Sequence, residues 1–424
     1  MGRASRLAGR GGGGVIGGRV TLLVDPDALA RLSAGRRSVL VSGTNGKTTT
    51  TRLLVAALAT AGPTATNSGG ANLPFGLVAA LSGAAPGGLA ALEVDEAYLG
   101  QVAAAARPEV VCLLNLSRDQ LDRISEVRML AGRWRQALAG TGGDGASGVG
   151  AGAASGDPSA DAPAGAHGGP VVVANADDPM VVWAASGAAR VVWVGAGLSW
   201  RLDATGCPRC EGRIQFTDAA WSCADCGFAR PDVHVSVDDG AMTDRSGRRH
   251  PFTLSLPGRC NRSNAAMAAT AASLLGVDEA QALTAMEPVA EVTGRYGVMR
   301  VGGVPARMLL SKNPAGWMEI FDFLRPAPSP VVVAINSRIA DGRDPSWLWD
   351  VPFERLAGRQ VVATGERCRD LAVRLRYAEV DHVMVVDAVA AVAEARRLGD
   401  QSAPVDVVAN YTAFQRLRRA AVDA

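Results

Sequence analysis

Short apolar runs alternate with segments of helical character along most of the chain. In the first part, the runs SVLVS, LAALEVD, EVVCLLN and VVVANADDP, which start at residues 38, 89, 109 and 171, are typical of buried strands. The stretches 48–61 and 264–275 are typical of helices. Because strands that alternate with helices form parallel sheets, we expect an α/β fold with a parallel central sheet.

The same alternation restarts towards the C-terminus. After the turn-like sequence EVTGRYG, the apolar runs PVVVAI, QVVATG, HVMVV and VDVVAN each precede a segment compatible with a helix. This spacing predicts a second, smaller Rossmann-like α/β domain. We therefore expect a first domain over residues 1–292 and a C-terminal domain over 293–424, with the boundary near Val292–Arg300.

Two segments interrupt the first domain. Residues 139–170 consist almost entirely of Gly, Ala, Ser, Asp and Pro, a composition that predicts a disordered surface insertion. Residues 203–232 contain two CxxC pairs and predict a small inserted ribbon. The sheet is expected to continue around both segments.

The composition excludes several classes of protein. With 424 residues, 48% apolar and 20% charged, the chain can bury real cores and is not disordered throughout. A net charge of +2 gives no general attraction to nucleic acid or to an anionic membrane. No apolar run reaches the ~18–20 residues of a membrane span, and the N-terminus lacks a secretory apolar core. Cysteines arranged in CxxC pairs favour metal in a reducing compartment, so we expect a cytoplasmic protein.

The sequence GTNGKT at residues 43–48 follows a β-branched strand and opens a helix. Backbone N–H groups at such a turn, together with the positive end of the helix, hold phosphate oxygens. Lys47 would reach the β- and γ-phosphates of a nucleotide, and Thr48 would bind Mg²⁺. Lysine chemistry is confined to two positions, because Lys47 and Lys312 are the only lysines of the chain. The alternative is a Gly-Lys-Thr turn that only packs.

Two cysteine pairs, Cys207-Pro-Arg-Cys210 and Cys223-Ala-Asp-Cys226, are separated by twelve residues. Two such pairs supply four thiolates for tetrahedral Zn²⁺, and a small insertion without its own core gains folding energy from the metal. Four sulfur ligands leave no open position, so the expected zinc is structural. Disulfides or a chance arrangement are the alternatives.

The C-terminal part carries two unusual segments, SKNPAG at 311–316 and ADGRDPSWLWD at 340–350. The second segment follows the strand PVVVAI, at the carboxyl edge of the predicted sheet where α/β sites form. Three carboxylates, an arginine and two tryptophans at that edge favour a functional loop. The alternative is a charged loop anchored by tryptophan packing.

The loop sequence GTNGKTTT resembles the ATP loop of the Mur ligase superfamily, whose members activate a carboxylate as an acyl phosphate and couple it to an amine. The motifs NSGGAN, EVDE, NLSRDQLDR, NADDP and GRCNRSNAAMAA, which start at residues 67, 93, 115, 175 and 258, follow in the same order. The resemblance implies that Glu93 helps to hold Mg²⁺ and that Asn261 and Asp178 lie near the adenine or ribose. The full set of implied ATP and Mg²⁺ contacts is Gly43, Thr44, Asn45, Gly46, Lys47, Thr48, Thr49, Glu93, Asp178, Asn261 and Arg295.

Three departures narrow this resemblance. Only 46 residues precede Lys47, fewer than the UDP-binding domain of the stepwise Mur ligases requires. Gln120 stands where the superfamily often has histidine, so the sequence does not establish a second metal ligand at this position. No lysine lies between Thr48 and Ser311, so the carbamylated lysine of many Mur ligases is not expected.

The short N-terminal part, the ribbon and the two C-terminal segments resemble the MurT family, the synthetase subunits of lipid II isoglutaminyl synthases. This resemblance implies ATP-dependent amidation of the D-glutamate α-carboxylate of the lipid II stem peptide, through an acyl phosphate, to give D-isoglutamine. It also implies that the enzyme works at the inner face of the cell membrane and that a GatD-like glutaminase, held by the C-terminal domain, supplies ammonia. No nucleic-acid partner is expected.

The resemblance further implies that Asp344 orients the histidine of the partner's glutaminase site. In the alternative interpretation, Arg343 pairs with Asp344 in a purely structural salt bridge. The chain's four histidines, His167, His234, His250 and His382, stand apart from the cysteine motifs, so no glutaminase site is visible within the chain itself.

Two other functions stay open at this point. One is a folylpolyglutamate-synthase-like amide ligase, which also lacks a UDP-binding domain. The other is a zinc-ribbon nucleotide-binding scaffold without catalysis. ATP turnover with lipid II and glutamine separates the three hypotheses.

Overall fold

The computed structural model describes residues 13–67, 71–118, 124–140, 169–198, 200–218, 220–290, 296–322, 324–400 and 402–422. Most of the insertion expected at 139–170 and the domain boundary expected at 292/293 lie outside the described residues. The chain divides into two compact units. The first comprises Met1–Leu116, Ser125–Ser255 and Cys260–Val289, and the second comprises Ser117–Ile124, Leu256–Arg259 and Ala290–Ala424.

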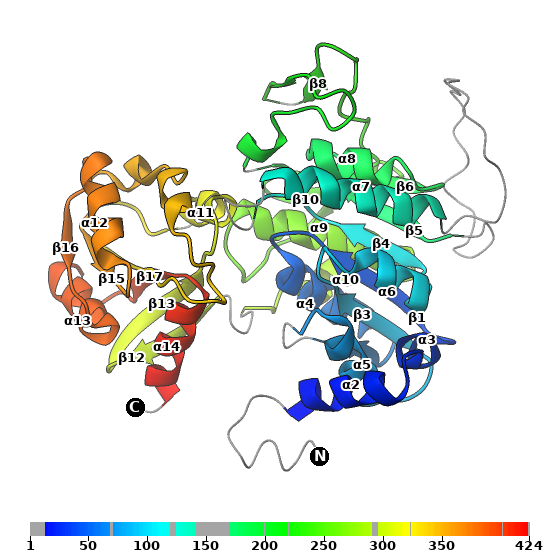
Figure 1. Cartoon of the computed structure of the whole chain (residues 1–424), viewed down its shortest axis with the longest axis horizontal. Helices are drawn as coiled ribbons and strands as arrows, with labels where there is room; N and C mark the ends of the chain where they lie inside the picture. The colour runs from blue at the N-terminus through cyan, green and yellow to red at the C-terminus, as the bar shows by residue number, and fades with distance from the viewer. Residues whose placement is uncertain are drawn as a thin grey trace. The chain divides into compact units, whose positions relative to one another are not determined.

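The first unit is built on a nine-stranded sheet in the order β11-β10-β9-β6-β5-β4-β1-β3-β2 (Figure 1). All neighbours from β2 to β9 pair in parallel, and β9, β10 and β11 form an antiparallel edge. The strands are β1 Arg37–Ser42, β2 Thr64–Thr66, β3 Leu89–Glu93, β4 Val110–Leu113, β5 Val171–Asn175, β6 Val191–Gly195, β9 Val235–Val237, β10 Ala241–Thr243 and β11 Arg249–Pro251. This mostly parallel sheet confirms the predicted fold class.

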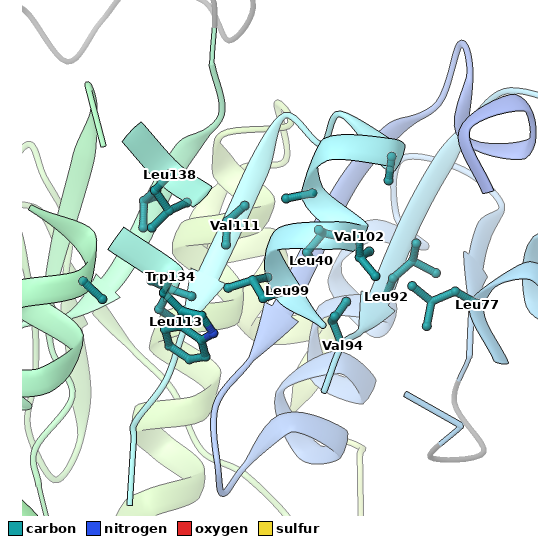
Figure 2. Close-up of a cluster of buried hydrophobic side chains, with 14 of the residues drawn as sticks. Leu40, Leu77, Leu92, Val94, Leu99, Val102, Val111, Leu113, Trp134 and Leu138 are labelled. Carbon is teal, nitrogen blue, oxygen red and sulfur yellow. The ribbon is translucent and has the colours of Figure 1, made fainter. Parts of the chain in front are cut away.

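Helices cover the central strands, which explains why these strands are continuous apolar runs rather than alternating ones. On one side, leucine and valine side chains of β1, β3 and β4 face α6 and α7, and Trp134 of α7 belongs to the same cluster (Figure 2). The helices of this unit are α2 Gly13–Val24, α3 Ala28–Ser33, α4 Lys47–Leu58, α5 Pro74–Ser82, α6 Leu99–Ala106, α7 Ile124–Gly140, α8 Pro179–Ala185, α9 Arg259–Ser273 and α10 Glu279–Met286, with a short 3₁₀ helix, η2, at Leu202–Ala204.

The predicted ribbon is a separate antiparallel hairpin of β7, Ile214–Phe216, and β8, Trp221–Cys223. Its own apolar cluster is small and includes Ile214, Trp221 and two of the four cysteines. The indole N–H of Trp221 donates to the carbonyl of Ala176 at 3.0 Å, which ties the hairpin to the loop after β5. So few apolar residues give the ribbon little burial with which to stabilise its own fold.

The second unit contains a six-stranded sheet in the order β12-β13-β17-β14-β15-β16. Its strands are β12 Tyr296–Val301, β13 Val304–Leu310, β14 Val331–Ala334, β15 Val361–Thr364, β16 His382–Met384 and β17 Val405–Ala409. Its helices are α11 Pro314–Phe321, η3 Ser346–Trp349, η4 Phe353–Leu356, α12 Cys368–Tyr377, α13 Ala388–Leu398 and α14 Tyr411–Val422. Two apolar clusters lie on the two faces of this sheet, as in doubly wound folds.

The strand order reverses between β14 and β17, because the chain runs outward from β14 to β16 and then returns to β17. Loops at the carboxyl ends of two strands diverge at such a switch point and leave room for functional side chains. The segment 335–345 and the start of α14 lie here, so the ADGRDPSWLWD segment occupies the predicted edge of the sheet.

The sequence analysis did not predict several elements. The antiparallel edge β9-β10-β11 consists of three-residue strands in a polar segment, which leaves almost no periodicity to detect. Strand β12 pairs antiparallel with β13 through a tight turn at Gly302 and Gly303, both at positive φ, so the C-terminal sheet is mixed rather than purely parallel. Helix α4 is shorter than expected, since it begins at Lys47 and ends at Leu58.

We predict that Asp406→Asn destabilises the second unit by roughly 3 kcal/mol, since it removes one partner of a buried ion pair. Asp406 on β17 is 1% exposed. It accepts hydrogen bonds from the Arg307 guanidinium at 2.7 and 2.9 Å and from the N–H of Arg325 at 2.9 Å. Urea unfolding followed by tryptophan fluorescence measures the change. The exposed Asp381→Asn is the control, and equal stability of the two variants would contradict the prediction.

Candidate functional site

The turn between β1 and α4 leaves no room for side chains at its two glycines. Gly43 has φ of +149° and Gly46, the residue before α4, has φ of +85°. A Cβ on Gly43 would lie 2.9 Å from the Cβ of Leu114, and one on Gly46 would lie 2.9 Å from Oδ1 of Asn264. Glycine is therefore required at both positions by close approach, and at Gly46 also by its left-handed backbone conformation.

Asn115, at the end of β4, fixes the middle of this turn. Its carbonyl accepts from the N–H of Thr44 at 2.9 Å, and its Oδ1 accepts from the N–H of Asn45 at 2.9 Å. Its Nδ2 donates back to the carbonyl of Asn45 at 3.1 Å. The turn is thus held by a neighbouring strand, and the N-terminus of α4 follows directly as a favourable place for an anion.

Lys47 is 5% exposed, and its ammonium group makes three contacts within the protein. It donates to the carbonyls of Gly43 at 2.5 Å and Thr44 at 3.3 Å and to Oε2 of Glu96 at 3.0 Å. Glu96 is held in turn, because its carbonyl accepts from the indole N–H of Trp134 at 2.8 Å. The buried charge is therefore neutralised by a carboxylate that an incoming anion can replace.

Thr48 and Glu93 form the adjacent polar pair. The Thr48 hydroxyl donates to Oε2 of Glu93 at 2.9 Å, and the carboxylate is 1% exposed. Asn67 brackets the end of β3, since its side chain accepts from the Glu93 N–H and donates to the Glu93 carbonyl, both at 2.8 Å. Asn72 lies 3.4 Å from Oε1 of Glu93. A hydroxyl, a carboxylate and an amide together are the hard oxygen donors that Mg²⁺ prefers.

Asp178 lies in the same unit but is fully enclosed. Its carboxylate caps α8 by accepting from the N–H groups of Met180 and Val181, and it accepts from the N–H of Leu116 at 2.8 Å. Burial raises the pKa of this carboxyl to about 6, although these hydrogen bonds oppose the shift. The contact with Leu116 fixes the chain next to Asn115. Asp178 therefore supports the turn at residues 43–46 indirectly, through Asn115.

The structure gives fewer contacts for the other residues that were expected to bind ATP or Mg²⁺. Asn261 lies at the start of α9, 3.4 Å from the Nδ2 of Asn264, whose Oδ1 approaches Gly46. Thr49 is half-buried in the first turn of α4. Arg295 and Gln120 lie outside the described residues. The ATP and Mg²⁺ contacts of all the expected residues stay predictions.

The four ribbon cysteines converge on one point. All four sulfur atoms lie within 4.8 Å of one another, with 3.7 Å between Cys207 and Cys226 and 3.5 Å between Cys210 and Cys223. A metal ion bound tetrahedrally at about 2.3 Å from each sulfur separates the sulfurs by about 3.8 Å. Both pairs form the same knuckle, in which the residue after the second cysteine, Glu211 or Gly227, has φ of +68°. The group has the composition and the spacing to hold one metal ion.

In the second unit, the loop after β14 is fixed by Asp341 rather than by Asp344. Asp341 is 7% exposed and accepts from the N–H of Thr412 at 2.8 Å, from the Thr412 hydroxyl, and from the N–H of Arg338 at 3.2 Å. Asn336 and Asn410 exchange hydrogen bonds of 3.0 and 2.7 Å across the switch point. These contacts hold the ends of strands β14 and β17 in one arrangement.

Asp344 is exposed at the far side of this loop. Its Oδ1 accepts from the N–H of Ser346 at 2.9 Å, and this bond lowers the pKa of the carboxyl, so it is charged at neutral pH. In the described part of the chain, no salt bridge joins Arg343 to Asp344. The alternative interpretation, a structural salt bridge between Arg343 and Asp344, is therefore not observed among these residues.

Comparisons with known proteins extend over both units. A model of the Mur ligase middle domain matches residues 41–132, and a model of the MurT ligase C-terminal region matches residues 310–414. The chain is 27% identical over 412 residues to the lipid II isoglutaminyl synthase (glutamine-hydrolyzing) subunit MurT of Streptococcus pneumoniae, covering 88% of this chain and 85% of that protein. The MurT subunit of Staphylococcus aureus strain N315 is 26% identical over 410 residues, 91% of this chain and 87% of that protein. These matches confirm the predicted resemblance to the MurT family of the Mur ligase superfamily.

Solved structures agree with the fold of this chain. A pseudomurein peptide ligase type C from Methanothermus fervidus has a TM-score of 0.65 at 19% identity and covers 92% of this chain and 78% of that one. MurF from Acinetobacter baumannii has a TM-score of 0.60 at 16% identity and covers 94% and 78%. The solved structures thus confirm the predicted fold, and the sequence comparisons support the predicted superfamily.

Sequence reasoning missed several residues of this candidate site. Glu96, Asn115 and Asn264 each approach residues 43–47 from a different part of the fold, and Trp134 of α7 holds Glu96 by a hydrogen bond. Glu96 and Asn115 fall in the motifs EVDE and NLSRDQLDR, and Asn264 follows Asn261 by one helical turn. The motifs marked the right segments, but only the packing of β4, α7 and α9 around the turn selects these side chains.

Proposed function

We propose that this chain is the synthetase subunit of a lipid II isoglutaminyl synthase. It is a carbon–nitrogen ligase of peptidoglycan synthesis that amidates the D-glutamate α-carboxylate of the stem peptide with ATP. The observation that carries the proposal is the buried Lys47–Thr48–Glu93 arrangement at the N-terminus of α4, in a chain whose MurT relatives bear that name. ATP and Mg²⁺ are the ligands that this arrangement suits.

The residues of the turn have distinct parts in the first step. The γ-phosphoryl group passes to a carboxylate oxygen of the substrate, which gives an acyl phosphate and ADP. Backbone N–H groups of the turn and the Lys47 ammonium would stabilise negative charge on the phosphates, with Glu96 released from its ion pair. Thr48 and Glu93 would hold Mg²⁺, which supplies further charge neutralisation on the transferred group.

The second step forms the amide. The nitrogen of ammonia attacks the acyl carbon, phosphate leaves, and the nitrogen loses a proton, which gives D-isoglutamine. This step needs only a source of ammonia, and a GatD-like glutaminase subunit would provide it from glutamine. The MurT relatives are named as one subunit of a glutamine-hydrolysing enzyme, which supports a two-subunit arrangement.

The second unit has an exposed aromatic pair on η3 and α12, which follow Asp344 along the chain. Trp349 of η3 and Tyr377 of α12 are 54% and 73% exposed and pack edge to face at 5.3 Å between ring centroids, with Val373, 51% exposed, on the same helix. Such an exposed aromatic pair is typical of interface anchors. We propose that the glutaminase binds here and that Asp344 orients its catalytic histidine.

The ribbon would hold one structural Zn²⁺. Four thiolates at tetrahedral spacing saturate the ion and leave no position for catalysis. Binding energy would replace the stabilisation that the small ribbon cluster cannot supply.

Lipid II lies in a membrane, and we propose that the chain works at the inner face of the cell membrane. Among the described residues, no helix combines the length and the apolar character that crossing a bilayer requires. Attachment to the surface, rather than insertion, would bring the chain to its substrate.

Two alternatives are weaker. A folylpolyglutamate-synthase-like ligase does not account for the match to the MurT C-terminal region over residues 310–414. A nucleotide-binding scaffold without catalysis does not account for relatives that are named as subunits of a glutamine-hydrolyzing synthase.

The first prediction concerns Lys47. Lys47→Ala should abolish amidation, measured by mass spectrometry of lipid II with ATP and ammonium, because no other lysine lies in the turn. Arg52→Ala, an exposed cation on the same helix, should retain activity and serves as the matched control. Circular dichroism checks that both variants fold. Amidation by a folded Lys47→Ala protein at the wild-type rate would show the site assignment to be wrong.

The second prediction concerns the ribbon. Elemental analysis should find one Zn²⁺ per chain, and Cys207→Ser should lose it together with thermal stability. Cys260→Ser, outside the ribbon, should keep the metal. Amidation by Cys207→Ser at low temperature should persist, since the ion is structural. Metal-free protein with unchanged stability would contradict this role.

The third prediction separates the two reactions. In the complex with its glutaminase, Asp344→Asn should lower glutamine hydrolysis by about 10³-fold or more, since a neutral amide no longer orients the partner's histidine or stabilises its cation. Amidation from added ammonium should stay near the wild-type rate.

Asp350→Asn is the control for this variant. Asp350 follows the same loop but is half-buried, so a milder effect on glutamine hydrolysis is expected. Normal glutamine hydrolysis by Asp344→Asn in a confirmed complex would rule out the shared site.

A further inference from the structure

Helix α2 carries an apolar stripe that faces away from the rest of its unit. Ile16, Val20, Leu23 and Val24 are 43%, 39%, 83% and 82% exposed. Their spacing of i, i+4, i+7 and i+8 places them on one face of the helix. Exposed aliphatic side chains are common singly, but a continuous helical stripe marks a surface that contacts something.

The opposite face of α2 is fixed to the protein. Gly18 lies so close to α5 that a Cβ there would be 1.8 Å from the Phe75 carbonyl oxygen, and Leu22 packs against the core. The Arg19 guanidinium lies 4.6 Å from the centre of the Phe75 ring. Figure 1 shows α2 alongside α5 at the edge of its unit. The stripe is thus presented by a docked helix.

The charged residues of the sequence up to the end of α2 all have one sign, although positions 3, 6 and 10 lie outside the described residues. Residues 1–24 contain four arginines, at positions 3, 6, 10 and 19, and no aspartate or glutamate, although the whole chain carries a net charge of only +2. The first acidic residue, Asp25, pairs with Arg31. An apolar helix face with neighbouring cations is typical of helices that lie on anionic lipid surfaces.

We propose that the α2 stripe of Ile16, Val20, Leu23 and Val24 binds the surface of an anionic membrane. A second copy of the chain is a poorer occupant, because two such segments would bring like charges together. The inference rests on the proposed function, because that function explains why the chain would bind a membrane: its lipid-linked substrate lies in the bilayer. The binding itself needs neither ATP nor the glutaminase.

The test measures sedimentation of the full chain with vesicles of phosphatidylglycerol and phosphatidylethanolamine. The triple variant Val20→Gln, Leu23→Gln, Val24→Gln should lower the apparent vesicle affinity by about tenfold or more, because it removes the apolar groups that enter the lipid. Wild-type protein should bind neutral phosphatidylcholine vesicles more weakly. Equal binding to both kinds of vesicle would overturn the part assigned to the arginines.

A matched control changes three exposed apolar residues elsewhere, Met129→Gln, Val298→Gln and Val386→Gln, which are 52%, 54% and 72% exposed. This variant should bind vesicles as the wild type does. Equal loss in both triple variants would overturn the inference. Light scattering tests the other occupant, because a wild-type dimer that the α2 variant abolishes, without any vesicle binding, would also overturn it.

Amidation assays distinguish this inference from the proposed function. With a water-soluble stem peptide that lacks the lipid chain, the α2 variant should match the wild type, and with lipid II in vesicles it should be slower. Stripe-dependent vesicle binding by a protein that never amidates would refute the proposed function and support the membrane contact. Amidation of vesicle-bound lipid II that is unaffected by the α2 variant would refute the contact and leave the function standing.

Discussion

The buried ammonium group of Lys47 needs acceptors around it, and the structure of the turn at residues 43–46 depends on that need. A cation that is only 5% exposed costs several kcal/mol unless acceptors surround it. Two acceptors are carbonyls of the turn itself, and the third is the carboxylate of Glu96. Glu96 is in place because Trp134 of α7 binds its carbonyl, so the packing of a helix across the sheet decides where the charge is neutralised. The backbone of the turn is therefore already in place, and the proposed phosphate ligand would require only the Lys47–Glu96 ion pair to open.

Much of this arrangement follows from the sequence, and the rest does not. The strands β1, β4 and β5 were predictable because they are buried on both faces and therefore consist of apolar runs. The turn was predictable because positive φ and close approach demand glycine at positions 43 and 46, and the chemistry demands lysine and threonine after them. These constraints act within a few residues of each other along the chain.

What escaped prediction depends on contacts between distant segments. Asn115 contacts Asn45 across 70 residues, and its amide could equally have faced solvent. The edge strands β10 and β11 form around Asp244, which accepts from the N–H groups of Ser246 and Arg248 and from the buried ring of His250 at 2.6 Å. In that segment, specific hydrogen bonds rather than apolar periodicity determine the strands, so no sequence pattern predicts them. The same holds for Asp341, which the sequence places beside Asp344 with no sign that one is buried and the other exposed.

The difference between these two carboxylates bears on the proposed glutaminase partner. Asp341 is committed to Thr412 and to the loop, whereas Asp344 is exposed and charged. A carboxylate that orients a histidine is useful only beside a cysteine–histidine pair. Among the described residues, the histidines are engaged elsewhere. His250 binds Asp244, Nδ1 of His234 accepts from the N–H of Trp193, and Nδ1 of His382 lies 2.8 Å from the Val380 carbonyl. Cys112 and Cys368 are buried, and burial further raises the pKa of the Cys112 thiol, which keeps it from acting as a nucleophile. Under the proposed function, Asp344 would be the third member of a glutaminase site, and the cysteine and histidine of that site would have to come from another chain.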